Sequence, residues 1–303
     1  MVVAGVAAPL LRKRVRVHPV VLQSVAYAAP LGLSVARPRT RGRDVAVCAL
    51  QMWAYIAAYK TPHDDEAAQA ARVLIRYPIV ADRVLGLGEL PTVRLQRGLS
   101  RSGPAGPEWR WLDRVLVWAH WSWFMVPHGT VAYMLVRRPE RFPRAAAITY
   151  AVFNVGASFY WIVPTAPPWY AAGADERTGA GAEDVRRMMV EYGEHFWRDG
   201  WGSLYSVFGG NPLAAMPSLH FATTVTAALL LAEVGVVAGA LGWAYATTLA
   251  FALVYLGEHY VVDLLAGAVL ALLVRRLAPL AAPFARSVAG KVAALEAMAQ
   301  EAI

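Results

Sequence analysis

The sequence predicts an all-α integral membrane protein, a bundle of six transmembrane helices with amphipathic helices on its outer face. Of its 303 residues, 57% are hydrophobic and 17% are charged, a balance typical of membrane proteins rather than soluble domains. Long apolar stretches recur along the chain, and arginines flank many of them. The 11 Trp and 13 Tyr residues suit the aromatic belts of membrane interfaces.

Charge and cysteine content narrow the function classes. A net charge of +8 is compatible with nucleic-acid binding, but the arginines lie beside apolar spans, so anchoring to a membrane surface explains them better. We therefore expect a lipid bilayer, and no nucleic acid, as a partner. Cys48 is the single cysteine and lies in an apolar segment, so neither a disulfide framework nor a cysteine-based metal site is expected.

Residues 1–43 are predicted to form a basic N-terminal interfacial segment. Arginine clusters bracket the apolar stretch 19–36, which Pro30 and Gly32 interrupt. We interpret 19–36 as an interfacial or re-entrant helix, and a true membrane crossing is the alternative.

The membrane core is predicted to cover residues 44–276, and its first three crossings are expected at 45–59, 112–136 and 145–163. Arginines precede the first crossing, and an arginine-rich run lies between the second and the third. The positive-inside rule places these arginine-rich ends in the cytoplasm.

Two polar regions are expected on the outer face. Residues 61–110 predict amphipathic surface helices, one of them over 67–79. Prolines in 164–169 are expected to end the third crossing. The outer loop that follows, 173–211, is predicted to contain a helix over 183–197.

Crossings four and five are predicted to form a hairpin between His220 and His259. The 39 steps between the two residues rise about 58 Å along a helix, close to two crossings of a hydrocarbon core of about 30 Å. Glu233 is the only charged residue from Phe221 to Leu256 and marks the turn. Both histidines therefore return to the outer face.

The sixth crossing is predicted over residues 260–274. Two arginines follow it directly. Residues 277–303 then form a cytoplasmic C-terminal tail.

The ends of the hairpin carry groups suited to phosphoryl transfer. Asp263 follows His259 by four residues, so on a helix its carboxylate can hold an imidazole N–H. Such an imidazole is a nucleophile, and a second one, His220, can protonate the departing oxygen. Pro217 suits a first helical position, and Ser218 with the free N–H groups of that helix end predicts an anion site. This chemistry needs no metal and no cofactor.

Segments 214–220 and 257–267 resemble the second and third signature motifs of the type 2 phosphatidic acid phosphatase superfamily. More narrowly, they resemble its aureobasidin-resistance, or inositol phosphorylceramide synthase, branch. Residues 163–168 share the likeness, which covers about 111–276. The N-terminal third matches only in layout.

The resemblance implies that His259 is the nucleophile, that Asp263 orients it, and that His220 is the general acid. Two positions depart from the pattern. The broader superfamily has an arginine where this chain has Leu253, and the branch often has one where this chain has Trp169. Other basic groups must then meet the phosphate charge.

Substrate-binding candidates are Ser218, Asn211 and Arg198. Arg198 is preferred to Arg186 and Arg187 because it is nearest in sequence to the second motif. The alternative for Asn211 is a purely structural role in the turn before the motif.

The leading hypothesis is a multi-pass plasma-membrane phosphatase or phosphotransferase that acts on a lipid-linked phosphate, through a phosphohistidine, at the extracytoplasmic face. An inositol phosphorylceramide synthase-like headgroup transferase is one alternative. A non-catalytic lipid-binding protein of the same fold is another, and a metal-dependent hydrolase that adds His120 as a ligand is a third. We interpret His120 and His128 as interhelical hydrogen-bonding groups. The oligomeric state stays open.

Overall fold

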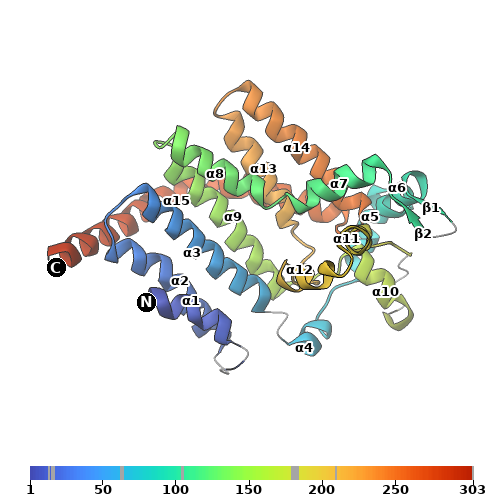
Figure 1. Ribbon diagram of the computed structural model, residues 1–303, viewed down its shortest axis with the longest axis horizontal. Helices are drawn as coiled ribbons and strands as arrows, with labels where there is room; N and C mark the ends of the chain where they lie inside the picture. Colours follow the sequence, from blue (N-terminus) through green and yellow to red (C-terminus); the bar gives the residue numbers. More distant parts are fainter. Residues whose placement is uncertain are drawn as a thin grey trace.

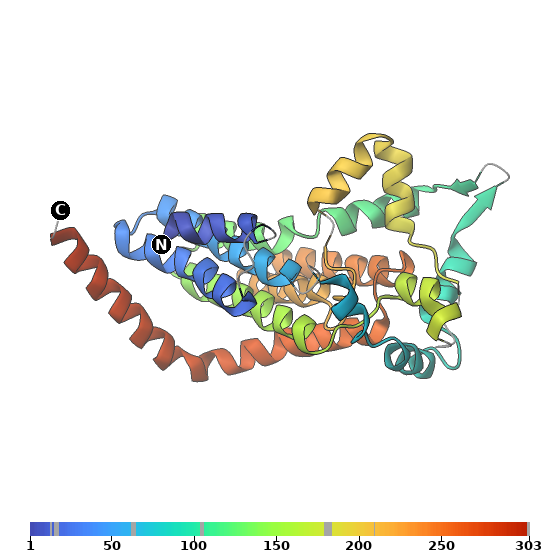
Figure 2. The same ribbon diagram turned by 90° about the horizontal axis from the view of Figure 1, so that it is seen from below.

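The computed structural model describes residues 1–12, 14, 18–61, 65–103, 106–178, 184–208 and 210–301. Within these ranges the helices and strands comprise α-helices and one two-stranded sheet. The elongated bundle has both chain termini toward one end and the sheet at the other (Figures 1 and 2). Three of its helices are long and apolar enough to cross a membrane. These findings support an all-α membrane protein in which the small sheet was not predicted.

The first helices along the chain are α1 (Val2–Leu11), α2 (Pro19–Ala36) and α3 (Arg41–Lys60). Pro30 lies inside α2 without ending it, and α2 is one of the three helices that could span a membrane. Its length and composition would allow residues 19–36 to cross a membrane, which was the alternative to an interfacial helix. Helix α3 covers the first predicted crossing and packs between α2 and α9 (Figure 1).

The expected single helix over 112–136 is wrong, because the chain forms α7 (Trp111–Trp121) and α8 (Met125–Arg137) with a break between them. Pro127 lacks an N–H, and its ring clashes with the carbonyl of Trp123 in a continuous helix. The backbone adapts with tighter turns, since the Trp123 N–H donates to the His120 carbonyl and the Val126 N–H to the Trp123 carbonyl.

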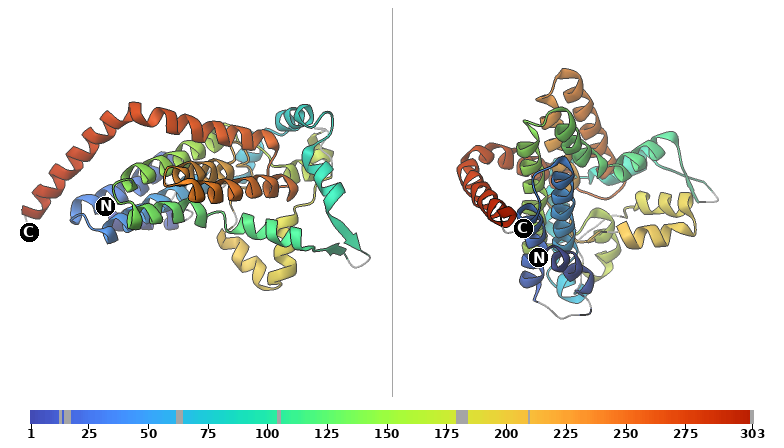
Figure 3. Two further views of the ribbon diagram at one scale, coloured as in Figure 1. Left: turned by 90° about the horizontal axis from the view of Figure 1, so that it is seen from above. Right: turned by 60° about the vertical axis from the view of Figure 1, so that its left-hand side comes forward.

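The remaining bundle helices are α9 (Phe142–Ile162), α13 (Leu219–Ala232), α14 (Val236–Tyr255) and α15 (Val261–Glu301). Helices α9 and α14 are the other two possible spans, and α13 is a shorter apolar helix. The predicted hairpin is present as α13 and α14, which pack side by side. Helix α15 continues without interruption past residue 276 and bends away from the bundle (Figure 3), where Pro279 and Pro283 weaken it.

The region that follows α3 in sequence contains α4 (Glu66–Ala70), α5 (Arg76–Leu85) and α6 (Pro91–Leu99), then β1 (Arg101–Gly103) and β2 (Gly106–Glu108). A helix over 67–79 is therefore wrong. The chain leaves the helical path at Leu74, whose backbone pairs with the strand-like segment around Thr165.

Three more helices follow the third predicted crossing: α10 (Pro168–Thr178), α11 (Met188–Trp197) and α12 (Gly200–Phe208). Helix α10 was not expected, although Pro168 suits its first position. The helix predicted over 183–197 is present from Met188, and Glu183 lies outside the described residues.

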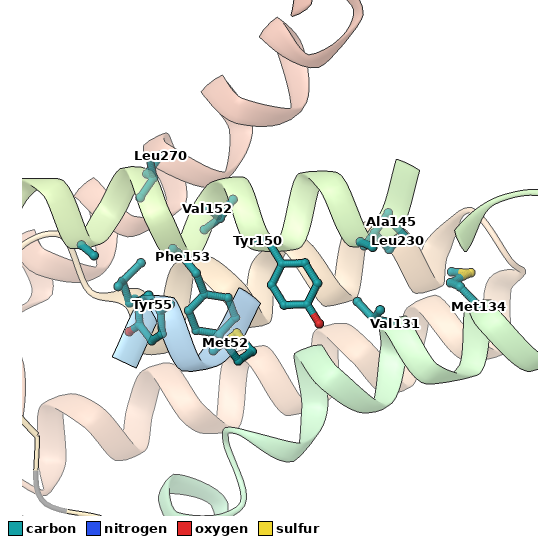
Figure 4. Close-up of a cluster of buried hydrophobic side chains, with 14 of the residues drawn as sticks. Met52, Tyr55, Val131, Met134, Ala145, Tyr150, Val152, Phe153, Leu230 and Leu270 are labelled. Carbon is teal, nitrogen blue, oxygen red and sulfur yellow. The ribbon is translucent and has the colours of Figure 1, made fainter. Parts of the chain in front are cut away.

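The main core lies where α3, α8, α9, α13 and α15 meet (Figure 4). At the turn between α13 and α14, the Glu233 carboxylate pairs with Arg144 of α9 at 2.7 Å and with Arg275 of α15 at 2.6 Å. Burial raises the pKa of Glu233, but the two arginines outweigh it and hold that pKa below its usual value. One acid thus joins three elements at the end of the bundle opposite the histidines.

Candidate active site

Two imidazoles and a carboxylate meet at the open end of the hairpin. His220 Nδ1 lies 3.1 Å from His259 Nε2, and His259 Nδ1 lies 3.3 Å from Asp263 Oδ2. Asp263 is fully buried, and His259 nearly so. The structure brings together the three residues for which the sequence predicts catalytic roles.

The loop before α15, rather than the helix, positions the nucleophile candidate. The expectation that His259 and Asp263 share a helix is wrong, because α15 begins at Val261. Asp263 reaches back from the first turn, where its Oδ2 also accepts the Tyr260 N–H at 2.9 Å. Gly257 turns the chain into this loop with a φ of 83°, a conformation that favours glycine.

Backbone contacts hold α13 against α15 directly beneath the histidines. The Ser218 N–H donates to the carbonyl of Asp263 at 3.0 Å. At Gly267 the helices touch so closely that a Cβ would lie 2.5 Å from the Ser218 carbonyl oxygen. The spacing between His220 and His259 therefore depends on this contact.

Both histidines line a cavity of about 570 Å³. Eleven of the 28 residues in its wall are Trp, Tyr or Phe, and the charged residues there are Lys60, Arg187 and Glu258. Cavities of this size and apolar character are typical of small-molecule sites. The space exceeds what a phosphate group alone requires.

The three predicted substrate-binding residues have different environments. Asn211 lines the cavity, and its buried amide nitrogen has no hydrogen-bond partner among the described residues. Ser218 is fully buried, does not line the cavity, and caps α13 by accepting the Phe221 N–H at 3.3 Å. Arg198 is exposed and is also absent from the wall. The structure thus brings only Asn211 of the three to the histidines' cavity.

A family model described as the PAP2 superfamily matches residues 107–277. This match covers more than half of the chain and contains both histidines. The protein belongs to the PAP2 superfamily. Members of the PAP2 superfamily are generally phosphatases, and membership suggests lipid phosphatase or phosphotransferase activity. No curated protein and no solved structure matches the chain.

The positions that depart from the PAP2 pattern have separate surroundings. Leu253 is fully buried in an apolar cluster with Leu249 and Leu264 and does not line the cavity. Trp169 does line it, and the guanidinium carbon of Arg187 lies 3.8 Å above the Trp169 ring. Arg187 therefore supplies a positive charge directly against the Trp169 side chain.

Arg187 is held beside the loop that carries His259. Its Nε lies 3.0 Å from Glu258 Oε1, and its Nη1 donates to the Tyr205 hydroxyl at 2.7 Å. Burial lowers the pKa of Arg187, but Glu258 and Tyr205 outweigh it, so that pKa lies above its usual value. Sequence distance from the second motif favours Arg198 over Arg187 as the phosphate-binding residue. This ranking is wrong, because nearness along the chain does not measure nearness in space.

His120 is a third imidazole in the cavity wall, with its ring centroid 5.1 Å from that of His220. Neither of its ring nitrogens has a hydrogen-bond partner among the described residues, so the predicted interhelical hydrogen bond is absent. His128 instead pairs within its own helix, with the Phe124 carbonyl at 2.8 Å. Among the described residues, no three His, Cys, Asp or Glu side chains are arranged to hold a metal ion.

Asp82 is a buried acid that the sequence analysis did not single out. Its two carboxylate oxygens accept the N–H groups of Val261 and Val262 at 2.9 and 2.8 Å, and so fix the start of α15. Burial raises the pKa of Asp82 to about 6, against the lowering effect of the two hydrogen bonds. An isolated Asp in a surface helix gives no signal of such a role in the sequence.

Proposed function

We propose that this protein is a membrane lipid-phosphate phosphatase or phosphotransferase that works through a phosphohistidine at His259. The observation that carries the proposal is the hydrogen-bonded row of Asp263, His259 and His220, whose two histidines line a cavity large enough for a lipid headgroup. PAP2 membership supports the same class of reaction.

The row of hydrogen bonds sets the protonation states. An ionised carboxylate only accepts, so His259 carries its proton on Nδ1, opposite Asp263, and Nε2 keeps a lone pair. His220 then donates from Nδ1 to that lone pair. Asp263 also stabilises the positive charge that develops on His259 during attack.

Attack by His259 Nε2 on the phosphorus forms a P–N bond and breaks the P–O bond to the leaving group. An in-line displacement puts the leaving oxygen opposite the attacking nitrogen, so the substrate must enter between the two rings and part their hydrogen bond. After taking up a second proton on Nε2, His220 as the imidazolium delivers its Nδ1 proton to the leaving oxygen and is left as a neutral imidazole. In the second half, water or a lipid alcohol gives a proton to His220, attacks the phosphorus and releases His259.

Phosphate binding falls to groups of the cavity wall. The unpartnered amide nitrogen of Asn211 is a hydrogen-bond donor for a phosphate oxygen. Arg187 takes the charge-neutralising role first expected of Arg198, because Arg187 lines the cavity and Arg198 does not. The free backbone N–H groups at the start of α13 add an anion-stabilising end of a helix dipole.

In this proposal the chain crosses the plasma membrane six times, and the site faces the extracytoplasmic side. The hairpin brings His220 and His259 to one end of the bundle, and Glu233 with its arginine partners marks the other. The positive-inside rule assigns the arginine-rich end to the cytoplasm. The six crossings of this proposal are α3, α7 with α8, α9, α13, α14 and the first part of α15, and α2 lies at the membrane interface.

A headgroup transferase of the inositol phosphorylceramide synthase type is the second candidate. The excess of cavity volume over the size of a phosphate favours it, since simple phosphate release needs no room for a headgroup. Assays with and without a hydroxylated lipid acceptor separate the two activities.

The proposal is tested with purified protein in detergent and a panel of lipid phosphates, in the presence of a chelator. We expect turnover that is lost in His259→Ala and retained in His128→Ala, a histidine outside the cavity. Turnover that persists in His259→Ala would disprove the proposed mechanism. A stable protein without turnover on any lipid, and without a trapped phosphohistidine, would favour the non-catalytic alternative.

A further inference from the structure

The charged groups of the cavity nearly cancel one another. Glu258 immediately precedes His259, its side chain is 10% exposed, and both of its oxygens face the guanidinium of Arg187. The only other cation among the described wall residues is Lys60, and Asp263 lies behind His259 with a negative charge. Two positive and two negative charges therefore surround the reacting histidines.

Such a site is poorly matched to a strongly anionic substrate. A phosphate monoester brings a charge near −2, and an anionic diester brings −1, into a region of low dielectric where uncompensated charge is costly. A phosphodiester whose headgroup carries an ammonium has no net charge. Electrostatic balance thus favours a zwitterionic headgroup.

The walls next to Glu258 already hold a cation on aromatic rings. The Arg187 guanidinium lies 3.8 Å above Trp169 and 5.6 Å from the centroid of Tyr205. The Trp201 ring continues this surface at 5.4 Å from Tyr205, and all three rings line the cavity. Aromatic faces bind alkylated ammonium groups through cation–π attraction, and a carboxylate beside them strengthens the site.

We propose that the substrate is a phospholipid whose headgroup is an amino-alcohol phosphate. Its phosphate binds at the histidines and draws the Arg187 guanidinium away from Glu258, and its ammonium group takes the place of that guanidinium against Glu258 and the Trp169, Tyr205 and Trp201 rings. The inference rests on the proposed function and names its substrate class. In the reaction, His259 takes the headgroup phosphorus, the diacylglycerol oxygen leaves with the proton from His220, and an acceptor hydroxyl later releases the headgroup.

Binding is measured first, because it does not depend on turnover. Four soluble probes represent the headgroup classes. Glycerophosphocholine and glycerophosphoethanolamine are zwitterionic diesters, glycerophosphoinositol is an anionic diester, and glycerol 3-phosphate is a monoester. Tryptophan fluorescence of the full-length protein in detergent reports occupancy, since several tryptophans line the cavity. We expect at least one of the two amine probes to bind the wild type about 10-fold more tightly than the inositol or monoester probe. The choline and ethanolamine probes distinguish a quaternary from a primary ammonium.

The decisive variant is Glu258→Gln, which keeps the side-chain shape and removes the charge. It is expected to weaken binding of the amine probes about 10-fold and to tighten binding of glycerol 3-phosphate, because Arg187 loses its counter-ion. Glu191→Gln is the matched control: Glu191 of α11 pairs with Arg186, which precedes that helix. Neither residue lines the cavity, so loss of the Glu191 charge should leave the binding of every probe within about 2-fold. Equal weakening of all probes by Glu258→Gln, or tighter wild-type binding of glycerol 3-phosphate than of both amine probes, overturns the inference.

Turnover of the four corresponding lipids, with equal acyl chains, separates this inference from the function on which it rests. If His259→Ala retains turnover, the proposed function fails whatever the probes show. If wild-type turnover depends on His259 but is fastest on phosphatidic acid or phosphatidylinositol, the substrate class is wrong and the mechanism stands.

Discussion

Replacement of Gly267 by alanine tests whether the α13–α15 contact sets the geometry of the histidine pair. A Cβ at this position would lie 2.5 Å from the Ser218 carbonyl oxygen, whereas ordinary contacts begin at 3.4 Å. The obstacle is backbone rather than the end of a flexible side chain, so the helices must separate by about 0.9 Å. Overpacking of this kind costs about 1–3 kcal/mol of folding free energy.

The same displacement acts on the reacting groups. His220 is two residues from Ser218, and Asp263 lies one helical turn from Gly267 on α15. The His220–His259 separation, 3.1 Å in the free protein, would grow toward 4 Å, so the nucleophile and the general acid would be displaced relative to a phosphorus bound between them. A misplacement of about 1 Å at a reacting centre can lower the rate by about 100-fold.

We therefore expect Gly267→Ala to lower kcat by about 100-fold with a modest fall in melting temperature, both measured in detergent. Gly290→Ala is the control on the same helix, because a Cβ there meets nothing within 4 Å. It should leave kcat unchanged and stabilise α15 by up to about 1 kcal/mol. A Gly267→Ala protein that turns over lipid within about 2-fold of the wild type would refute the reasoning.

Three further predictions concern residues around the site. Burial raises the folded-state pKa of Asp82 from 3.8 to about 6, so its contribution to folding stability is fully present below pH 3.8, and up to about 3 kcal/mol of stability is lost as pH rises through 6. The melting temperature of the wild type relative to Asp82→Asn should therefore fall between pH 4 and 7. A difference in melting temperature that stays constant over this range contradicts the prediction. Glu233→Gln should lower the free energy of unfolding by about 1 kcal/mol without changing kcat, because the pairs with Arg144 and Arg275 lie at the other end of the bundle; a loss of turnover at unchanged stability would speak against that placement. Leu253→Arg should prevent folding rather than improve phosphate binding, because it buries an unpaired charge. Leu253→Met should lower the free energy of unfolding by less than about 1.5 kcal/mol. Size-exclusion profiles and melting curves of the two variants test both expectations.

Features written in local patterns could be predicted from the sequence. The length of apolar chain between His220 and His259 fixes two helices that fold back, and the structure has this hairpin. Glu233 marks the turn of this hairpin, since it is the only charged residue in the apolar run. Pairing of the two histidines followed from these constraints alone.

Features that depend on contacts between distant segments could not be predicted. The break before Pro127 has a local cause, but a proline inside an apolar run also occurs in continuous kinked helices, so the pattern was ambiguous. Arg187 reaches the site because the start of α11 pairs with the loop after α14: the Met188 N–H donates to the Leu256 carbonyl at 3.1 Å. Asp82 joins the site across a similarly long stretch of chain. No spacing in the sequence encodes either meeting.

In the proposed mechanism, His259 becomes covalently attached to the substrate's phosphorus. The most direct measurement of this step is a rapid acid-free quench of the protein with a phospholipid carrying ³²P in its headgroup, followed by mapping of the label by mass spectrometry. We expect an acid-labile, alkali-stable adduct on His259 that accumulates in His220→Ala when the lipid has a good leaving group, and that is absent from His259→Ala. Steady turnover by the wild type with no label on His259 under these conditions would contradict it.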